Sequence, residues 1–253
     1  MCYDISYLTK RQIDYAKRYG RKEDVDDIQQ RHPPVYHTSG FDHPDIPVIT
    51  QEDPDRIQMM EWGLIPWWIK TNQEAIKISN STLNARAETL STKPAFRDSL
   101  VNKRCLVLVD GFFEHHHHKH KTYPYFIFLK NGEPFSIAGL YSEWTSPDRI
   151  VKRTVSLITT KGNSMLSRIH NNPKMDGPRM PAIVIKEQES DWLDKSLSTK
   201  DSRQFQEMLV PYDSDEMESY TVGKLRGKNA PGNSLNALQK QHYPELDQPL
   251  SLF

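Results

Sequence analysis

The chain has few of the residues and runs that mark several classes of protein. Only two of its 253 residues are cysteines, Cys2 and Cys105, too few for a disulfide framework, so a reducing compartment is expected. No apolar run approaches the ~20 residues that a membrane-spanning helix needs. The N-terminus turns polar by Lys10 and Arg11, so we expect no signal peptide. These absences together predict a cytoplasmic protein.

The chain also has a formal net charge of zero, because 33 basic residues balance 33 acidic ones. This balance excludes a globally basic nucleic-acid coat and leaves room for a local basic patch. Residues 145–181 hold seven basic and two acidic residues, whereas residues 201–220 hold six acidic and one basic. The basic stretch is either a solvated face or a groove near Arg168 and Arg179. On charge alone the solvated face is the more frequent outcome.

Apolar residues make up only 36% of the chain, but five Trp, eleven Tyr and nine Phe supply large surfaces for a core. A wholly disordered chain is therefore excluded. No internal repeat and no Gly/Ser-rich linker divides the sequence. We expect a single domain over residues 1–253, with a core of about 2–222 and a polar C-terminal extension over 223–253.

Short apolar runs bounded by turn residues recur through the second half of the chain. They predict strands over 105–109, 125–129, 135–144, 154–160, 181–185 and, more weakly, 218–222. The pair Asp110 and Gly111 predicts a turn after the first run, and Asn131 and Gly132 predict a hairpin after the second. Strands at this spacing favour a curved antiparallel sheet or a barrel.

Helices are expected around this sheet, at 94–103 with Pro94 in the first turn, at 191–193 and at 202–209. The highly charged segment 11–31 predicts one or two exposed helices. Five prolines make segment 32–56 extended and loop-like. The sequence therefore predicts an α+β fold: one mixed, mostly antiparallel, barrel-like sheet with peripheral helices.

Cys2 stands where removal of Met1 would leave an α-amine and a thiol on one residue. Both groups are partly reactive near neutral pH, since their ordinary pKa values are ~7.7–8.0 and ~8.5. Such a 1,2-aminothiol condenses with an aldehyde to an imine, and addition of the thiol then closes a five-membered thiazolidine. The alternative use is hydrolytic, with the thiol attacking an amide. Cys2 can also be an ordinary second residue, so this chemistry needs partner groups.

Three later segments offer those partners. In the first, Asn84 can hold the α-amine or an oxyanion, and Arg86 can bind a phosphate through its guanidinium fork. The structural alternative is a capping loop in which Asn84 bonds to backbone and Arg86 pairs with Glu88. In the second, Glu114 follows two aromatic residues at a strand end, and burial there would make it a usable proton donor. In the third, His170 can shuttle protons at neutral pH. An exposed strand-end Glu114 and a structural His170 are the alternatives.

The run from His115 to His120 invites a metal interpretation. Adjacent histidines on a strand point to opposite faces, which is poor geometry for one tetrahedral site, and no cysteine or acidic cluster has ligand spacing beside it. We interpret this run as an exposed loop and expect no structural metal and no cofactor. Cys105 lies in an apolar run and is interpreted as a small buried hydrophobe.

Eight short motifs, in this order along residues 2 to about 222, resemble those of the SOS-response-associated peptidase (SRAP) family. They are Met1-Cys2, Trp62–Trp67, Asn84–Glu88, Arg104–Leu106, Asp110–Glu114, Thr159-Thr160, Ile169-His170 and Arg179–Pro181. Each motif alone is weak, and the ordered set is specific.

The resemblance implies a function and a fold. SRAP proteins sense abasic sites in single-stranded DNA, where the mature N-terminal cysteine forms a thiazolidine crosslink with the ring-opened deoxyribose and shields the lesion. By motif position Cys2 is the nucleophile, Asn84 holds the α-amine and the sugar, and Glu114 and His170 are the acid/base pair. The resemblance also implies self-removal of Met1 or of an N-terminal peptide, that is, a thiol autopeptidase with lyase-like crosslinking activity. The family fold, a barrel-like mixed sheet with flanking helices, agrees with the prediction above.

The resemblance further implies contacts with DNA and a cellular setting. Arg86 and Arg179 would bind phosphates, Trp67 or Trp68 would pack against bases near the lesion, and Thr160 would join this surface. The partner is single-stranded DNA that carries abasic sites, with replication-fork proteins as further candidates. We expect a monomer in the bacterial cytoplasm, associated with the nucleoid when bound to DNA.

Two other functions remain open. An N-terminal-nucleophile cysteine amidohydrolase also begins with Met-Cys, but that class expects glycine-rich sequence after the cysteine and a layered sheet sandwich. A non-covalent single-stranded DNA-binding module is the other, with Cys2 incidental. It predicts that Cys2→Ala protects DNA as well as the parent protein does.

Overall fold

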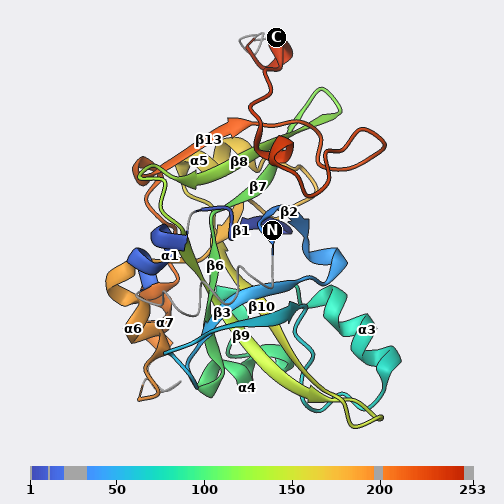
Figure 1. Ribbon diagram of the computed structural model, residues 1–253, viewed down its shortest axis with the longest axis vertical. Helices are drawn as coiled ribbons and strands as arrows, with labels where there is room; N and C mark the ends of the chain where they lie inside the picture. Colours follow the sequence, from blue (N-terminus) through green and yellow to red (C-terminus); the bar gives the residue numbers. More distant parts are fainter. Residues whose placement is uncertain (1, 11, 20–32, 197–201, 248–253) are drawn as a thin grey trace.

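The computed structural model describes residues 2–10, 12–19, 33–196 and 202–247 (Figure 1). Its strands are β1 (Asp4–Tyr7), β2 (Val35–Ser39), β3 (Asp45–Thr50), β4 (Ile57–Trp62), β5 (Asn84–Arg86), β6 (Arg104–Val109), β7 (Gly111–His118), β8 (Lys121–Leu129), β9 (Phe135–Thr145), β10 (Val151–Lys161), β11 (Arg179–Pro181), β12 (Ile183–Val184) and β13 (Met217–Thr221). Its α-helices are α1 (Gln12–Tyr19), α3 (Asn72–Ser81), α4 (Pro94–Asn102), α5 (Ser164–Ile169), α6 (Glu189–Leu193) and α7 (Ser202–Met208). In the described part of the chain, no helix combines the length and apolar character needed to cross a bilayer.

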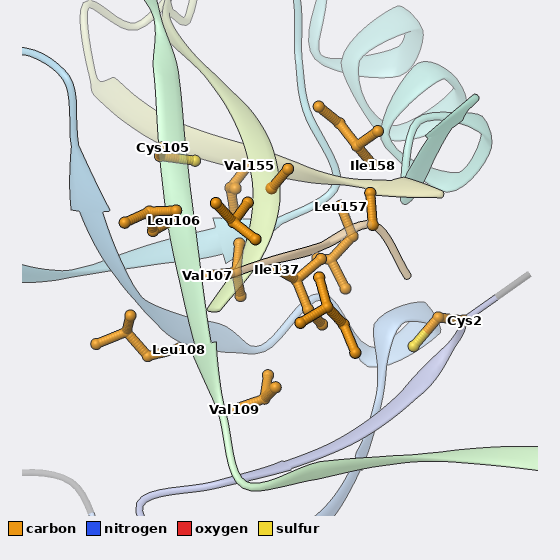
Figure 2. Close-up of a cluster of buried hydrophobic side chains, with 14 of the residues drawn as sticks. Cys2, Cys105, Leu106, Val107, Leu108, Val109, Ile137, Val155, Leu157 and Ile158 are labelled. Carbon is orange, nitrogen blue, oxygen red and sulfur yellow. The ribbon is translucent and has the colours of Figure 1, made fainter. Parts of the chain in front are cut away.

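Five strands close into a barrel. β10 pairs with β4, β4 with β3, β3 with β6, β6 with β9, and β9 with β10 again. All of these pairings are antiparallel except β10 with β4. Its interior is apolar because the inward-facing positions are aliphatic: Figure 2 shows Val107, Ile137, Val155 and Leu157 gathered between the strands.

A second sheet has the order β13-β8-β7-β1-β2, and all its pairings are antiparallel. It lies above the barrel in Figure 1, with β1 between β2 and β7. The chain passes from the barrel strand β6 to β7 at Asp110. There the Asp110 carboxylate accepts hydrogen bonds from the Thr9 backbone N–H at 2.7 Å and the Tyr15 hydroxyl at 2.5 Å. These hydrogen bonds hold the N-terminal segment against Asp110, where the chain passes from the barrel to the second sheet.

The expected α+β fold, with a mixed, mostly antiparallel, barrel-like sheet, is confirmed. The strands predicted from 105–109, 125–129, 135–144, 154–160 and 218–222 correspond to β6, β8, β9, β10 and β13, and the helix expected at 94–103 is α4. The expectation of one sheet was incomplete, since a second sheet covers the barrel. Helix α3 was not predicted, although Thr71 caps it by accepting a hydrogen bond from the Glu74 backbone N–H.

Two local predictions were wrong. The hairpin expected at Asn131 and Gly132 does not form: the chain turns there, with the Gly132 N–H donating to the Leu129 carbonyl, but β8 and β9 then join different sheets. The histidine run is not a loop, because His115–His118 pair with β8. Only the turn at Lys119 and His120 leaves the strands, with the positive φ values of a two-residue hairpin.

The N-terminal third also differs in part from the prediction. Segment 32–56 is extended as expected, but it contains the paired strands β2 and β3 instead of a loop. Of the charged segment 11–31, α1 is the described helix, and residues 20–32 lie outside the described residues. Tyr15 in α1 is fully buried, so this helix is not merely an exposed one.

Gly111→Ala is expected to destabilise the fold by about 1–3 kcal/mol, because added volume at a packed position forces neighbouring groups apart. A Cβ at Gly111 would lie 2.4 Å from the Phe126 ring and 2.8 Å from the Ile127 carbonyl oxygen. Gly223→Ala is the matched control, since its Cβ would meet nothing within 4 Å. Chemical denaturation of the two variants and the parent measures this difference, and equal stability of all three would contradict it.

Candidate functional site

Cys2 lies just before β1, with 1% of its surface exposed, and its sulfur is at the margin of the barrel core (Figure 2). The thiol is 3.8 Å from the carbonyl oxygen of Asp4, to which it donates. Burial raises the pKa of this thiol well above its ordinary value, and the negative charge of Glu114 raises the pKa further. The thiol is therefore protonated at neutral pH in this structure.

Asn84 holds the main chain of Cys2. Its position is set by β5, which runs parallel to β10 with Asn84 opposite Leu157. The side-chain Nδ2 donates to the carbonyl oxygen of Cys2 at 2.8 Å. The other atom of this amide, Oδ1, is buried and accepts no hydrogen bond from the described residues. An unsatisfied buried acceptor costs about 1–3 kcal/mol, so this oxygen would favour a new donor beside it.

Glu114 and His170 form a buried pair, with Nδ1 of His170 at 2.8 Å from Oε2 of Glu114. Glu114 comes from β7, and His170 follows α5, whose first turn is capped by the Asn163 side chain. The same Nδ1 lies 3.0 Å from the carbonyl oxygen of Arg179 and 3.2 Å from its backbone N–H. Protonated Nδ1 thus has acceptors, and deprotonated Nδ1 has a donor. This arrangement suits a nitrogen that gains and loses a proton.

The pair opens onto a pocket of about 440 Å³. Other residues that line it are Tyr3, His115, His117, Lys224 and Arg226. Burial lowers the pKa of the His115 and His117 imidazoles, so both are neutral at neutral pH. No group of three or more His, Cys, Asp or Glu side chains within the described ranges could hold a metal ion.

Arg86 and Arg179 line a second pocket, of about 490 Å³. The Arg86 side chain is 42% exposed and lies 4.0 Å from the Asp176 carboxylate. Arg179 is buried: its guanidinium donates to both Glu88 oxygens at 2.7 and 3.0 Å. Glu88 therefore pairs with Arg179 instead of Arg86, and a phosphate at Arg179 would have to displace it. Arg86 is the arginine of this pocket that is accessible as the structure stands.

Thr160, Trp67 and Trp68 are not among the described contacts of Cys2. Thr160 is buried in β10 opposite Met180. Trp67 and Trp68 are exposed by 63% and 37%. They follow Ile65, whose N–H donates to the Thr154 side chain, whereas Asn84, which bonds to Cys2, lies opposite Leu157. Three residues of extended strand span about 10 Å, so the two indoles lie toward the start of β10, away from the residue that holds Cys2.

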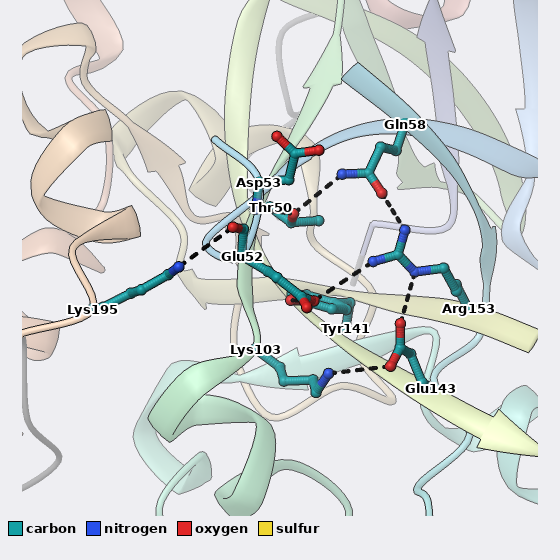
Figure 3. Close-up of polar contacts among 9 residues, drawn as sticks. All are labelled: Thr50, Glu52, Asp53, Gln58, Lys103, Tyr141, Glu143, Arg153 and Lys195. Carbon is teal, nitrogen blue, oxygen red and sulfur yellow. Dashed lines mark hydrogen bonds and ion pairs between the residues drawn. The ribbon is translucent and has the colours of Figure 1, made fainter. Parts of the chain in front are cut away.

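Part of the basic stretch 145–181 is neutralised by carboxylates. At the start of β10, Arg153 pairs with Glu143 at 3.1 Å and with Glu52 at 3.8 Å (Figure 3). Lys152 pairs with Glu61 at 2.8 Å. Together with the pairing of Arg179, this shows that the local excess of basic residues does not by itself form a positive groove.

Comparison with known proteins gives the family of this chain. The family model described as SOS response associated peptidase (SRAP) matches residues 1–228. This chain belongs to the SRAP family. The abasic site processing protein YoqW of Bacillus subtilis is 39% identical over 196 residues, covering 77% of this chain and 81% of YoqW. The abasic site processing protein HMCES of Gallus gallus is 28% identical over 220 residues, covering 73% of this chain and 61% of HMCES.

A crystal structure of a protein from Bacteroides thetaiotaomicron has the same fold as this SRAP chain. The TM-score is 0.84 at 36% identity, covering 95% of this chain and all of the other. Within that fold, the structure brings the four predicted catalytic residues of the SRAP chain together: Asn84 bonds to Cys2, Glu114 to His170, and the Glu114 charge acts on the Cys2 thiol.

Sequence reasoning missed several residues that line the pocket of this SRAP protein. His115 and His117 follow Glu114 directly along β7, and strand alternation gave no signal for them, because it places them on the opposite face from Glu114. Lys224 and Arg226 were placed in a polar extension outside the core, yet they form part of the pocket wall. No motif connects them to Cys2, since they lie more than two hundred residues away in the sequence.

Proposed function

We propose that this SRAP protein processes abasic sites in single-stranded DNA by covalent capture through Cys2. The names of its relatives support abasic-site processing. The observation that carries the mechanism is the hold of Asn84 on the Cys2 main chain, beside the buried Glu114–His170 pair. An aminothiol next to an acid/base pair is what capture of an aldehyde requires.

The first step is hydrolysis of the Met1–Cys2 peptide bond, which consumes one water and leaves a free α-amine on Cys2. That amine is a new N–H donor on the residue that Asn84 already holds. The buried Oδ1 of Asn84 is the acceptor that suits it. Asn84 would then orient the lone pair of the amine, with its Nδ2 on the Cys2 carbonyl and its Oδ1 on the amine. Self-processing of this bond is part of the proposal.

Capture follows in balanced steps. The closed deoxyribose opens when a base takes the C1′ hydroxyl proton and an acid protonates the ring oxygen. The amine adds to the C1′ aldehyde, and loss of one water gives an imine. The thiol then adds to the imine carbon, forming the C–S bond, and its proton passes to the nitrogen. Glu114 and His170 carry these protons, which suits a pair in which both protonation states of His170 Nδ1 have partners.

The remaining residues are proposed to hold the DNA. Arg86 is half-exposed, lies two residues from Asn84 on β5, and would bind a phosphate. Arg179 would do so only by exchanging Glu88 for the phosphate, and Thr160 would support this strand end. Trp67 and Trp68 would stack on bases further along the DNA strand than the lesion, because the preceding Ile65 bonds to Thr154, near the start of β10.

The test is incubation of the purified protein with single-stranded DNA that carries one abasic site. We expect a complex that survives denaturation, with none formed on intact DNA of the same sequence. The mass of the unreacted protein should show Met1 removed. Absence of an adduct, or an adduct formed by protein that retains Met1, would overturn the mechanism. Hydrolysis of a small amide substrate without any adduct would favour the cysteine amidohydrolase instead.

A further inference from the structure

The segment after β13 is packed onto the second sheet, whose strand β1 begins two residues after Cys2. Leu225 is 5% exposed and belongs to one apolar cluster with Phe113, Phe126 and Val222. The Gln241 N–H donates to the Thr221 carbonyl at 2.8 Å, which ties the returning chain to β13. The backbone on either side of Leu225 is therefore held in place, and Lys224 and Arg226 are brought to the pocket of Glu114 and His170.

Arg226 is fixed at its other end by a buried carboxylate. Its Nη2 donates to both oxygens of Asp4, at 2.7 and 2.8 Å, and lies 3.3 Å from the Ser39 hydroxyl. The Asp4 side chain is only 3% exposed, and its Oδ1 also lies 2.9 Å from Nε2 of His37. Asp4 is two residues from Cys2, so this cluster attaches a guanidinium to β1, the strand that follows the nucleophile.

The guanidinium keeps donors for another partner. Within the described chain, all of its hydrogen bonds run through Nη2, and the side chain is 52% exposed. Nε and Nη1 are thus available on a group whose orientation is already set. Of the two carboxylates beside it, Asp4 is bound to Arg226 itself, and Glu114 is paired with His170. Lys224 adds a second positive charge to the same pocket wall.

We propose that Arg226, with Lys224, binds a backbone phosphate next to the captured nucleotide, and that Asp4 is the positioning residue for this contact. This proposal rests on the proposed function. The phosphate is a different one from that assigned to Arg86, since the two arginines line different pockets. A pre-oriented guanidinium loses little freedom on binding, which favours the phosphate contact.

The test uses intact single-stranded DNA, so that no covalent step enters the measurement. Arg226→Gln should raise Kd about 5-fold near 0.1 M salt and reduce the slope of log K against log salt by about 0.7, the value for one lost contact on a single strand. Lys130→Gln is the control of equal charge loss, because Lys130 lies in the turn after β8, where its Nζ donates to the Asp215 carbonyl away from this pocket, and the variant should bind like the parent. An Arg226→Gln slope equal to that of the parent would overturn the proposal.

Asp4→Asn separates positioning from simple charge. This variant makes the protein more positive, so a purely electrostatic effect would tighten DNA binding. Loss of positioning predicts weaker binding, with Kd raised about 3-fold, and tighter or unchanged binding would contradict the role of Asp4. If Asp4→Asn does not fold, Arg226→Lys is the variant to measure. Lysine keeps the positive charge, so the slope of log K against log salt should be unchanged. It loses the two-pronged guanidinium contact, so Kd for DNA should still rise.

The outcomes distinguish this inference from the proposed function. At saturating abasic DNA, the parent and Arg226→Gln should both form the covalent adduct, because Arg226 touches no reacting atom. If the parent forms no adduct, the proposed function fails whatever the salt slopes show. If the parent forms the adduct and Arg226→Gln binds DNA like the parent, only the phosphate contact fails.

Discussion

Cys2→Ser is expected to lower the yield of denaturation-resistant adduct by at least about 100-fold, because a hydroxyl is a far weaker nucleophile than a thiol. Serine is small, so a methionine aminopeptidase can remove Met1 where self-processing through the thiol is lost, and the α-amine is then present; the mass of the variant checks this. The variant should therefore still form the imine, which borohydride reduction would trap. Adduct without reduction measures ring closure, and adduct after reduction measures condensation.

The matched control for this experiment is Cys105→Ala. Cys105 lies in β6, fully buried, and burial raises the pKa of its thiol far above the ordinary value. It has no route to DNA, so its removal should leave the adduct yield unchanged. A stable adduct in Cys2→Ser without reduction, or its loss in Cys105→Ala at unchanged stability, would show that the thiol of Cys2 is not the ring-closing group.

The candidate catalytic residues could be identified from the sequence because they stand in short ordered motifs. Cys2, Asn84, Glu114 and His170 follow one another along the chain at wide intervals, and the resemblance to the family named all four. Their contacts could not be derived, since the parallel pairing of β5 with β10 and the place of β1 beside β7 depend on the closed sheets. The pairing of Glu88 with Arg179 instead of Arg86 has the same origin.

The wrong predictions come from interactions that local patterns do not contain. Asn131 and Gly132 do form a turn, but whether a hairpin follows depends on the partners of β8 and β9, which lie in different sheets. The histidine run has no strand pattern of its own, and pairing with β8 makes it a strand. The contact of Arg226 with Asp4 joins residues more than two hundred positions apart, so no periodicity or spacing in the sequence predicts it.

Glu114→Gln is expected to slow adduct formation about 100-fold while leaving Kd for intact single-stranded DNA unchanged. Glutamine keeps the shape of the side chain but cannot take up or release a proton. Removing the Glu114 charge also removes one cause of the raised pKa of the Cys2 thiol. The change in thiol pKa alone would make the thiol ionise more readily and ring closure faster. A slower adduct formation in Glu114→Gln would therefore show that the loss comes from proton transfer.

Glu143→Gln is the control of equal charge change, because Glu143 lies in the remote ion-pair network on β9 with Arg153 and Lys103 (Figure 3). Its adduct rate should match that of the parent. The proposal that Glu114 and His170 exchange protons as a unit predicts that the double variant Glu114→Gln/His170→Gln is hardly slower than Glu114→Gln alone. Rates that multiply would mean that the two residues act separately. Equal losses of DNA affinity and adduct rate would mean that Glu114 only shapes the pocket.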